Sequence, residues 1–243
     1  MTARPLRDIL FVDIETVAAA PSLEEMNNPM RQAWESKVDY IDWTDEEVTP
    51  GELFEYEAGL YAEFGRIVSI SVAYFYEKDG GALELRVKTF ASVDNEPWLL
   101  KQFMQLLNDR FDQRSLRLCS HNGKEFDFPY LCRRMLVHCI PIPEALNFAG
   151  KKPWEVPHLD TMEMWMFGNR KYTISLQTLT ALFGIDYEPH PDGDEINRLF
   201  YEDGQEGLDA IVLHSQQDVI ATAQVYMRYR CQPLLKPEQI VVV

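Results

Sequence analysis

Long apolar runs, clustered cysteines and an excess of positive charge are all missing from this sequence of 243 residues. No apolar run approaches the roughly 20 residues that a membrane-spanning helix needs. Residues 1–8 also lack the apolar stretch of a secretory signal peptide. We therefore expect a cytoplasmic protein without a membrane partner. The four cysteines, at positions 119, 132, 139 and 231, show no Cys-x-x-Cys spacing, which argues against a zinc finger and favours reduced packing residues.

Basic residues are few: 23 Lys and Arg face 39 Asp and Glu, for a net charge of −16. Such a charge repels polyanions and counts against a broad nucleic-acid-binding face. The acids are concentrated between residues 39 and 63, however, whereas Arg133-Arg134, Lys151-Lys152 and Arg170-Lys171 form local basic sites. Metal ions bound to acids would also make the local potential positive. A nucleic-acid partner stays compatible with the composition, with weak and salt-sensitive binding expected.

The apolar pattern predicts one α/β domain. Strands are predicted at residues 8–14, 66–76, 83–90, 116–121 and 156–161, with a hairpin turn at 78–81. Helices are predicted at 95–111, 126–137, 175–183, 192–200 and 208–229. The first is amphipathic, with a core face formed by Trp98, Leu99, Phe103, Leu106 and Leu107. This order of strands and helices is typical of a mixed five-stranded sheet flanked by helices. Residues 18–64, with helix-like stretches at 23–37 and 50–62, are rich in Asp and Glu and are interpreted as an acidic insertion within the single domain 1–243.

Two acids end the first strand. Asp13 and Glu15 are two residues apart, so their side chains point to the same face. Carboxylates held this close repel each other, and a divalent cation relieves the repulsion. The alternative is a solvated strand end followed by Thr16 as a helix N-cap. The pair alone leaves both interpretations open.

A third acid follows the strand predicted at 116–121. Gly123 permits a tight turn, which puts Asp127 in the first turn of the next helix. There it either faces a ligand or caps the helix. Asn122 at the strand tip can bind a phosphate or sugar, or simply hold the turn. Phe126 offers a ring for base stacking or for core packing.

The fourth acid, Asp218, lies in the last predicted helix, one turn after His214 and on the same face. Apolar neighbours suggest that Asp218 is partly buried, where an Asp needs a metal, a base or a hydrogen-bond partner. The alternative is a His214–Asp218 pair on an exposed face. His158 and Asp160 also lie close in sequence, but two ligands fall short of a metal site. We expect them to be structural.

In combination, the motifs Asp13-x-Glu15, Asn122-x-x-x-Phe126-Asp127 and His214-x-x-x-Asp218 resemble those of the DEDD 3′→5′ exonucleases of the ribonuclease H-like fold. The nearest group is the predicted exonucleases related to the proofreading domain of family-B DNA polymerases. Segments 63–70, 159–161, 175–179 and 217–222 are also similar, and the resemblance covers most of residues 8–229 outside the insertion. One feature departs from the pattern: His214 has the spacing of the family's tyrosine branch, which leaves the general base open.

The resemblance implies a ribonuclease H-like fold and hydrolysis of phosphodiester bonds at the 3′ end of single-stranded nucleic acid, with DNA favoured over RNA. It implies two Mg²⁺ or Mn²⁺ ions, held by Asp13, Glu15, Asp127 and Asp218. His214 would orient or deprotonate the attacking water. The terminal nucleotide would be positioned by Thr16, Asn122, Phe126 and Arg66. The alternatives are a non-catalytic nucleic-acid-binding or interaction module on the same fold, and a two-metal endonuclease. The acidic insertion is a candidate site for a protein partner.

Overall fold

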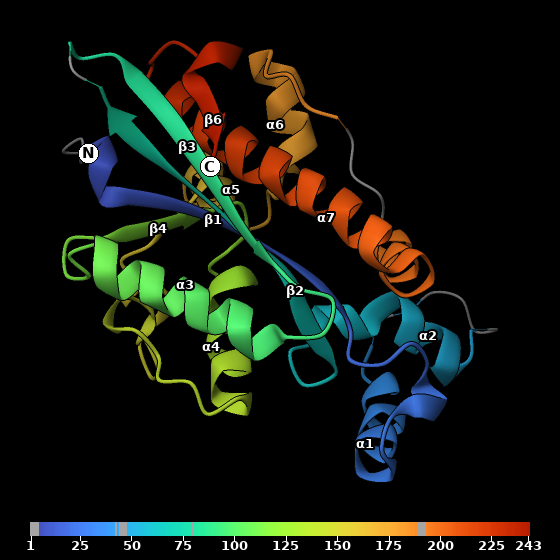
Figure 1. The fold of residues 1–243 in the computed structure, drawn as a ribbon. Coiled ribbons are helices and arrows are strands. Elements are labelled where there is room, and N and C mark those ends of the chain that lie inside the picture. Colours follow the sequence, from blue (N-terminus) through green and yellow to red (C-terminus); the bar gives the residue numbers. More distant parts are fainter. Residues whose placement is uncertain (1–4, 42, 44–47, 79, 189–192) are drawn as a thin grey trace.

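The computed structural model describes residues 5–41, 43, 48–78, 80–188 and 193–243 (Figure 1). Its centre is a mixed six-stranded sheet with strand order β5-β4-β1-β2-β3-β6. The strands are β1 (Ile9–Ala18), β2 (Gly65–Glu77), β3 (Leu83–Ala91), β4 (Arg117–Ser120), β5 (Leu159–Asp160) and β6 (Ile240–Val242). The predicted α/β class is confirmed. The sheet has one strand more than expected, because the three-residue β6 is too short to show a clear alternation.

Helices cover both faces of the sheet (Figure 1). The α-helices are α1 (Asn28–Val38), α2 (Pro50–Glu57), α3 (Glu96–Arg110), α4 (Asp127–Val137), α5 (Thr161–Met166), α6 (Leu176–Phe183) and α7 (Gly193–Tyr229). Short 3-10 turns span Leu6–Asp8, Leu23–Glu25, Ala58–Leu60, Glu144–Leu146, Pro153–Glu155 and Pro237–Gln239. Among the described residues, no helix is long and apolar enough to cross a membrane.

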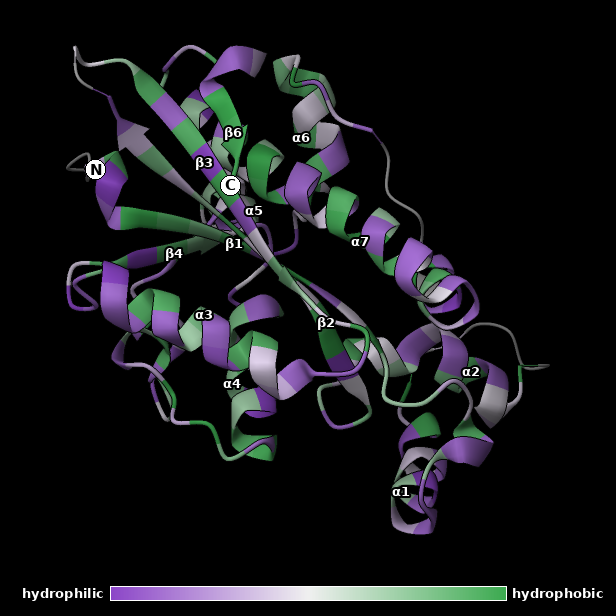
Figure 2. Cartoon of the chain, viewed as in Figure 1, coloured by the Kyte–Doolittle hydropathy of each residue, from purple (hydrophilic) through white to green (hydrophobic). Residues whose placement is uncertain are grey.

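Strand β1 is central and separates two cores. It pairs antiparallel with β2 and parallel with β4, and Figure 2 shows how apolar its first half is. Val12 and Ile14 pack into the core under α3 and α4. Phe11 packs into the core under α7. Because side chains alternate along a strand, the residues on the Phe11 face that follow, Asp13 and Glu15, are directed toward α7.

Helix α7 joins two segments that the sequence predicted as separate helices. Gly204 has φ 56° and ψ −117° inside the helix, a conformation that an L side chain rarely adopts. The gap predicted between residues 200 and 208 is therefore a break in direction within one element. Residue 192, where the first predicted helix began, lies outside the described residues, as does residue 79 of the predicted hairpin turn.

The buried face of α3 differs from the predicted one, because an acid occupies its first turn. Glu96 is 5% exposed, and Leu99, Leu100, Phe103 and Leu107 follow it on the same face. Trp98, expected in the core, is 45% exposed. The helix is rotated so that Glu96 faces inward, where it has buried partners.

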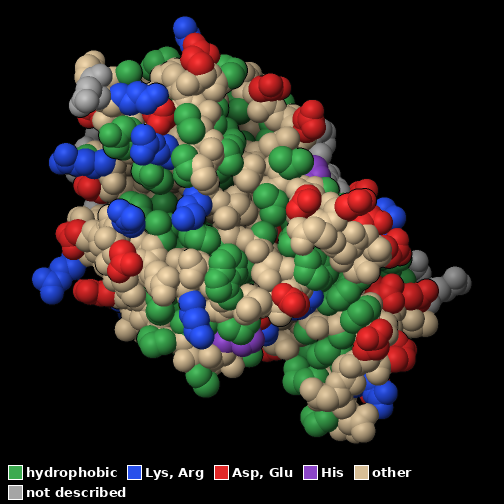
Figure 3. Space-filling view, viewed as in Figure 1, with side chains coloured by type: hydrophobic (Ala, Val, Ile, Leu, Met, Phe, Trp, Pro, Cys, Tyr) green, Lys and Arg blue, Asp and Glu red, His purple; other side chains and the backbone are tan. Residues whose placement is uncertain are grey.

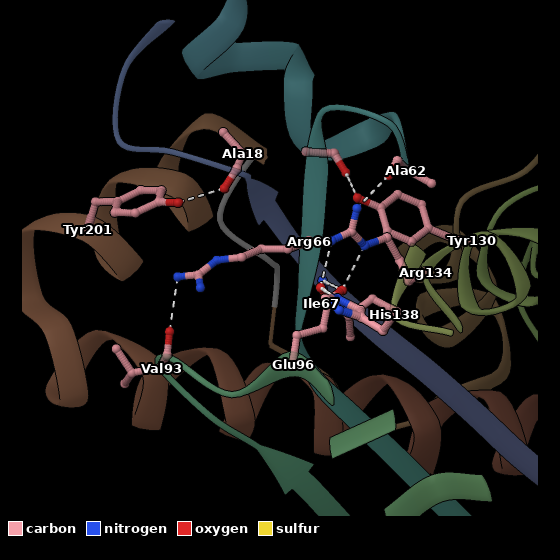
Figure 4. Close-up of polar contacts among 11 residues, drawn as sticks. Ala18, Ala62, Arg66, Ile67, Val93, Glu96, Tyr130, Arg134, His138 and Tyr201 are labelled. Atoms are coloured by element: carbon pink, nitrogen blue, oxygen red, sulfur yellow. Dashed lines mark hydrogen bonds and ion pairs between the residues drawn. The ribbon is translucent and has the colours of Figure 1, made fainter. Parts of the chain in front are cut away.

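Those partners connect α3 to α4 and β2 (Figure 4). Arg134 donates from Nε and Nη2 to the two carboxylate oxygens of Glu96, at 2.9 and 2.6 Å. The Ile67 amide donates to Oε1 at 2.8 Å, and His138 Nε2 lies 2.6 Å from Oε2. Although burial alone raises the pKa of Glu96, hydrogen bonding and charge from Arg134 bring it below its usual value. Arg134 is itself buried, so the prediction of a basic surface site there was wrong.

The insertion has its own small core at the end of β1. Trp34 is fully buried and packs edge-on against Phe54 at 5.3 Å, and both belong to a cluster that includes Ala18. The last turn of the insertion, Ala58–Leu60, contacts β1 directly, because the Gly59 carbonyl accepts a hydrogen bond from Thr16 Oγ1 at 2.8 Å. The insertion is therefore folded against the strand end that carries the first two acids.

The four cysteines are free. Cys119 is buried in the core under α7, as the packing interpretation required. Cys139 and Cys231 are exposed, so that interpretation was wrong for these two. Both follow the ends of helices, α4 and α7, and have positive φ angles of 52° and 54°.

Candidate active site

Asp13 and Glu15 face α7 from the middle of β1. The Ser215 hydroxyl of α7 donates to Asp13 Oδ2 at 2.8 Å. Glu15 is only 9% exposed. The pairing of β1 with β2 shifts register immediately after Glu15. The alternative of a solvated strand end is excluded, because the strand continues to Ala18 and the acids are covered by a helix.

Asp127 is hydrogen-bonded to the backbone of β1 at Ile14, between Asp13 and Glu15. It is the first residue of α4 and is 4% exposed. Its Oδ1 accepts a hydrogen bond from the backbone amide of Ile14 at 3.2 Å. The turn before it has no room for a side chain at Gly123: a Cβ there would lie 2.3 Å from the Ser120 Cβ and 3.2 Å from Asp127 Oδ2. The glycine therefore allows β4 and α4 to approach closely enough to place Asp127 beside β1.

Asp218 enters the site from α7. Its neighbour Val219 is fully buried, and the Tyr187 hydroxyl donates a hydrogen bond to the Asp218 carboxylate. Tyr187 lies in the loop between α6 and α7 and packs against the apolar cluster of Leu179 and Ile185. His214, one turn before Asp218, is half-buried on the same helix.

The four carboxylates are close enough to affect one another's ionisation. Burial first, and then the charges of Asp218, Glu15 and Asp127, raise the pKa of Asp13 well above its usual value. Burial, followed by the charges of Asp218 and Asp127, does the same for Glu15. Burial raises the pKa of Asp127 from 3.8 to about 7, against the effect of its hydrogen bonds. Such a cluster is stabilised either by protons or by a cation.

The donor set fits a hard divalent cation. All four groups offer carboxylate oxygens, which favour Mg²⁺ or Mn²⁺ over zinc, and repulsion among them is relieved by positive charge. In the conformation described, no group of three or more Asp, Glu, His or Cys side chains among the described residues already encloses an ion position. Ligation of an ion by these groups would therefore require a change in their side-chain rotamers.

Three of the four predicted substrate-binding residues, Thr16, Asn122 and Phe126, are next to residues of this cluster in the sequence or the structure. Thr16 follows Glu15 directly in the sequence, and its hydroxyl donates a hydrogen bond to the Gly59 carbonyl. Asn122 adopts a positive φ of 66° at the end of β4 and lines a cavity beside the site. Phe126 is half-buried and contacts Tyr130, with ring centroids 5.3 Å apart. Their contact with a nucleotide stays a prediction.

Arg66 is held on another part of the α7 side. Its Nη2 donates to the Val93 carbonyl at 3.0 Å, as Figure 4 shows. Its guanidinium lies over the rings of Phe200 and Tyr201, 4.8 and 5.9 Å from their centroids. These contacts join β2 to the first half of α7. A substrate contact of Arg66 stays a prediction.

His158 and Asp160 have structural partners, as expected. His158 Nδ1 accepts from the Leu118 amide at 3.2 Å, and its Nε2 bonds the Ala145 carbonyl at 2.8 Å. Burial lowers the pKa of this imidazole to about 4, which keeps it neutral. Asp160 accepts hydrogen bonds from four backbone amides, those of Asn122, Lys124, Met162 and Glu163.

Two residues of the site were not found from the sequence. Ser215 lies three residues before Asp218. This i, i+3 spacing puts it on the face of α7 that bears the acid, and is the signal by which the sequence could have identified it. Tyr187 has no such signal, because it lies in a loop whose path depends on how α6 packs against α7. Burial, and then the charge and hydrogen bonding of Asp218, raise the pKa of Tyr187, and the charges of Asp13 and Glu15 add to this effect. Its hydroxyl therefore stays protonated and acts as a donor.

A buried acid cluster between the central strand and a long helix, on a sheet of this order, defines a class: the ribonuclease H-like nuclease fold. The structure of the family B DNA polymerase from the hyperthermophilic archaeon Pyrobaculum calidifontis matches it with a TM-score of 0.52 and 14% identity. The match covers 94% of this chain and 25% of the polymerase chain. This chain thus spans about a quarter of that polymerase, and the likeness concerns the fold.

Sequence comparison then identifies the family. Residues 60–237 match the model of the predicted 3'-5' exonucleases related to the exonuclease domain of PolB, and the chain belongs to this family. A search of curated proteins gives no match. The matched range includes Asp127 and Asp218 but begins after β1. Asp13 and Glu15 lie outside the matched range; in the structure Asp13 accepts a hydrogen bond from Ser215, and the Ile14 amide between the two acids donates to Asp127.

Proposed function

We propose that this protein is a metal-dependent 3′→5′ exonuclease that removes nucleotides from the 3′ end of single-stranded nucleic acid, with DNA preferred over RNA. Two Mg²⁺ or Mn²⁺ ions would be held by Asp13, Glu15, Asp127 and Asp218. The observation that carries the proposal is the convergence of these acids, from β1, α4 and α7, with raised carboxyl pKa values at Asp13, Glu15 and Asp127. Family membership supports the reaction, and relationship to PolB supports DNA.

The residues of the chain have separable roles. When bound, divalent ions stabilise the negative charge that develops on the phosphate oxygens and activate water. Ser215 fixes one oxygen of Asp13. The Ile14 amide donates to one oxygen of Asp127, and the Ser120 side chain also hydrogen-bonds this carboxylate. Tyr187 orients Asp218. His214, one turn away, is the candidate to accept a proton from the attacking water, since a neutral imidazole serves as a base near pH 7.

The test is digestion of a 5′-labelled single strand in the presence of Mn²⁺. A ladder of products shortened one nucleotide at a time from the 3′ end is expected, with a circular strand left intact. Asp218→Asn should abolish the ladder, while Asp209→Asn, an exposed acid on the same helix, should leave it unchanged. Cleavage of the circle would instead identify an endonuclease. If the linear strand stays intact under excess protein, the protein is not a nuclease, and the alternative of a non-catalytic binding module is favoured.

Two further expectations concern preference and partners. Matched DNA and RNA strands should be degraded at different rates, with DNA faster. Figure 3 shows acidic side chains gathered over α2 and the first half of α7, with Lys and Arg mostly on the opposite side of this view. This acidic surface, which includes the insertion, is suited to a basic protein partner. A cytoplasmic location stays a prediction from the sequence.

A further inference from the structure

A cavity of about 480 Å³ adjoins the carboxylate site on the other side of the β4–α4 turn. Asn122 and Lys124 of that turn form one wall. The residue between them, Gly123, packs against Asp127, so a single turn separates the cavity from the acids. The volume falls within the range of roughly 300–1,000 Å³ that is usual for small-ligand sites.

The cavity carries cations that other acids do not neutralise. Lys124 is paired with Glu163 at 2.5 Å, and Asp160 is fully used by backbone amides. Lys151 and Arg170 also line the cavity. Within the described part of the chain, no carboxylate pairs with either of them. The lining also holds three acids, Glu125, Asp160 and Glu163. Because Asp160 is engaged by backbone amides and Glu163 by Lys124, two cations without an acid partner among the described residues face one such acid, Glu125, and favour an anion.

The remaining lining is apolar and suited to a planar base. Phe148, Met162 and Met166 contribute to it. The chain next to the lining also exposes aromatic rings to solvent: Trp154 is 71% exposed and Phe167 is 90% exposed. Aromatic and apolar surfaces interleaved with Lys and Arg are typical of sites that bind single strands, because every base offers a face for stacking.

The positive lining also continues away from the acids. Lys151 lines a second hollow, of about 340 Å³, together with Arg117 and with the ion pair of Arg114 and Glu144, whose atoms are 3.7 Å apart. Lys151, in the loop after α4, lines both hollows, so the two meet there. A strand that ends at the carboxylates and passes Asn122 would meet cationic side chains in succession.

We propose that the 480 Å³ cavity binds a nucleotide of the single strand upstream of the 3′ end, with its base against Phe148 and Met162 and its phosphates at Lys151 and Arg170. This inference rests on the proposed exonuclease function, since it places the 3′ end at the carboxylates. It also resolves the conflict between an acidic chain and an anionic substrate, because affinity comes from a local cationic site.

The experiment measures binding apart from cleavage. Fluorescence anisotropy records the affinity of the whole chain for a labelled single strand of about 12 nucleotides, linked by phosphorothioates so that it survives, over a range of salt concentrations. The test variant is Lys151→Gln/Arg170→Gln. The matched control is Lys101→Gln/Arg110→Gln, which removes the same charges from exposed positions on α3.

The test variant should bind about tenfold more weakly at low salt, and its dependence of log K on log salt should be shallower by about 1.4, because each lost phosphate contact contributes about 0.7 for a single strand. The control should keep the wild-type salt slope. A single abasic nucleotide, moved along the strand, should weaken wild-type binding most at one internal position. Equal slopes for test and control variants, or no binding by the wild-type chain, would overturn the proposal.

These outcomes are separate from those for the reaction. A chain that cleaves from the 3′ end but whose affinity does not depend on Lys151 and Arg170 keeps the proposed function and loses this site. A chain that binds with the expected slopes but leaves a normal phosphodiester strand intact in Mn²⁺ keeps the site and loses the exonuclease.

Discussion

Replacing Asp127 with Asn should stabilise the metal-free protein while it removes activity. Asp127 is 4% exposed, and burial raises its pKa from 3.8 to about 7. Between these values the folded state binds more protons than the unfolded state, so stability falls as the pH rises. At about 1.36 kcal/mol per unit, burying this carboxyl costs on the order of 1–2 kcal/mol at pH 5 and about 4 kcal/mol at pH 8. Asn has the same shape and keeps the acceptor for the Ile14 amide, but carries no charge.

The measurement is thermal unfolding in EDTA at pH 5 and pH 8. For a chain of this size, about 4 kcal/mol corresponds to a rise in Tm of roughly 8–16 °C, so Asp127→Asn should melt well above the wild type at pH 8. The gain at pH 5 should be less than half as large. Asp109→Asn, an exposed acid on α3, serves as the control and should shift neither melting temperature.

Mn²⁺ should narrow the difference at pH 8. The wild-type chain gains stability by binding the ion, about 2.7 kcal/mol at a concentration one hundred times its Kd, whereas the variant has lost a ligand and should gain less. Hydrolysis by the variant should fall at least a hundredfold. A variant that is equally stabilised at both pH values, or not stabilised at pH 8, would show that burial does not raise the pKa of Asp127 as described.

Three further changes test the scaffold and the base. Arg134→Met leaves Glu96 buried without its main partner and should cost about 3–5 kcal/mol, measured by urea unfolding, with much of the loss recovered when Glu96→Gln is added. Gly123→Ala should displace Asp127 and lower the rate and the Mn²⁺ affinity together, measured by turnover and by titration calorimetry, while the fold, followed by circular dichroism, persists. His214→Tyr restores the family's residue at the same spacing: if position matters more than the imidazole, the variant stays active, measured by the rate of digestion; an inactive variant would show that the imidazole is required.

Local patterns in the sequence were sufficient to predict much of the site. Alternation along the first strand placed Asp13 and Glu15 on one face, and the turn permitted by Gly123 brought Asp127 to the start of α4. Each of these features depends on residues a few positions apart, so the chain carries the information locally. The structure adds the contact that joins them, from the Ile14 amide to Asp127, across 113 positions of sequence.

What the sequence did not predict depends on pairing between distant elements. Trp98 was expected in the core because it is large and apolar, but the orientation of α3 is set by Glu96 meeting Arg134 of α4. The same pair removed Arg134 from the basic surface. Tyr187 reaches Asp218 from a loop, and no helical or strand period identifies such a residue.

Gly204, whose φ and ψ angles are not helical, divides α7 into two segments with different contacts. Residues 193–203 belong to the part of the molecule where Phe200 and Tyr201 contact Arg66 and Tyr201 bonds Ala18. Residues 205–229 carry Ser215 and Asp218 across the sheet. Because the non-helical Gly204 lies between them, α7 is not one regular rod. Changes in the first segment should therefore have less effect on the orientation of Ser215 and Asp218 than they would in an unbroken helix.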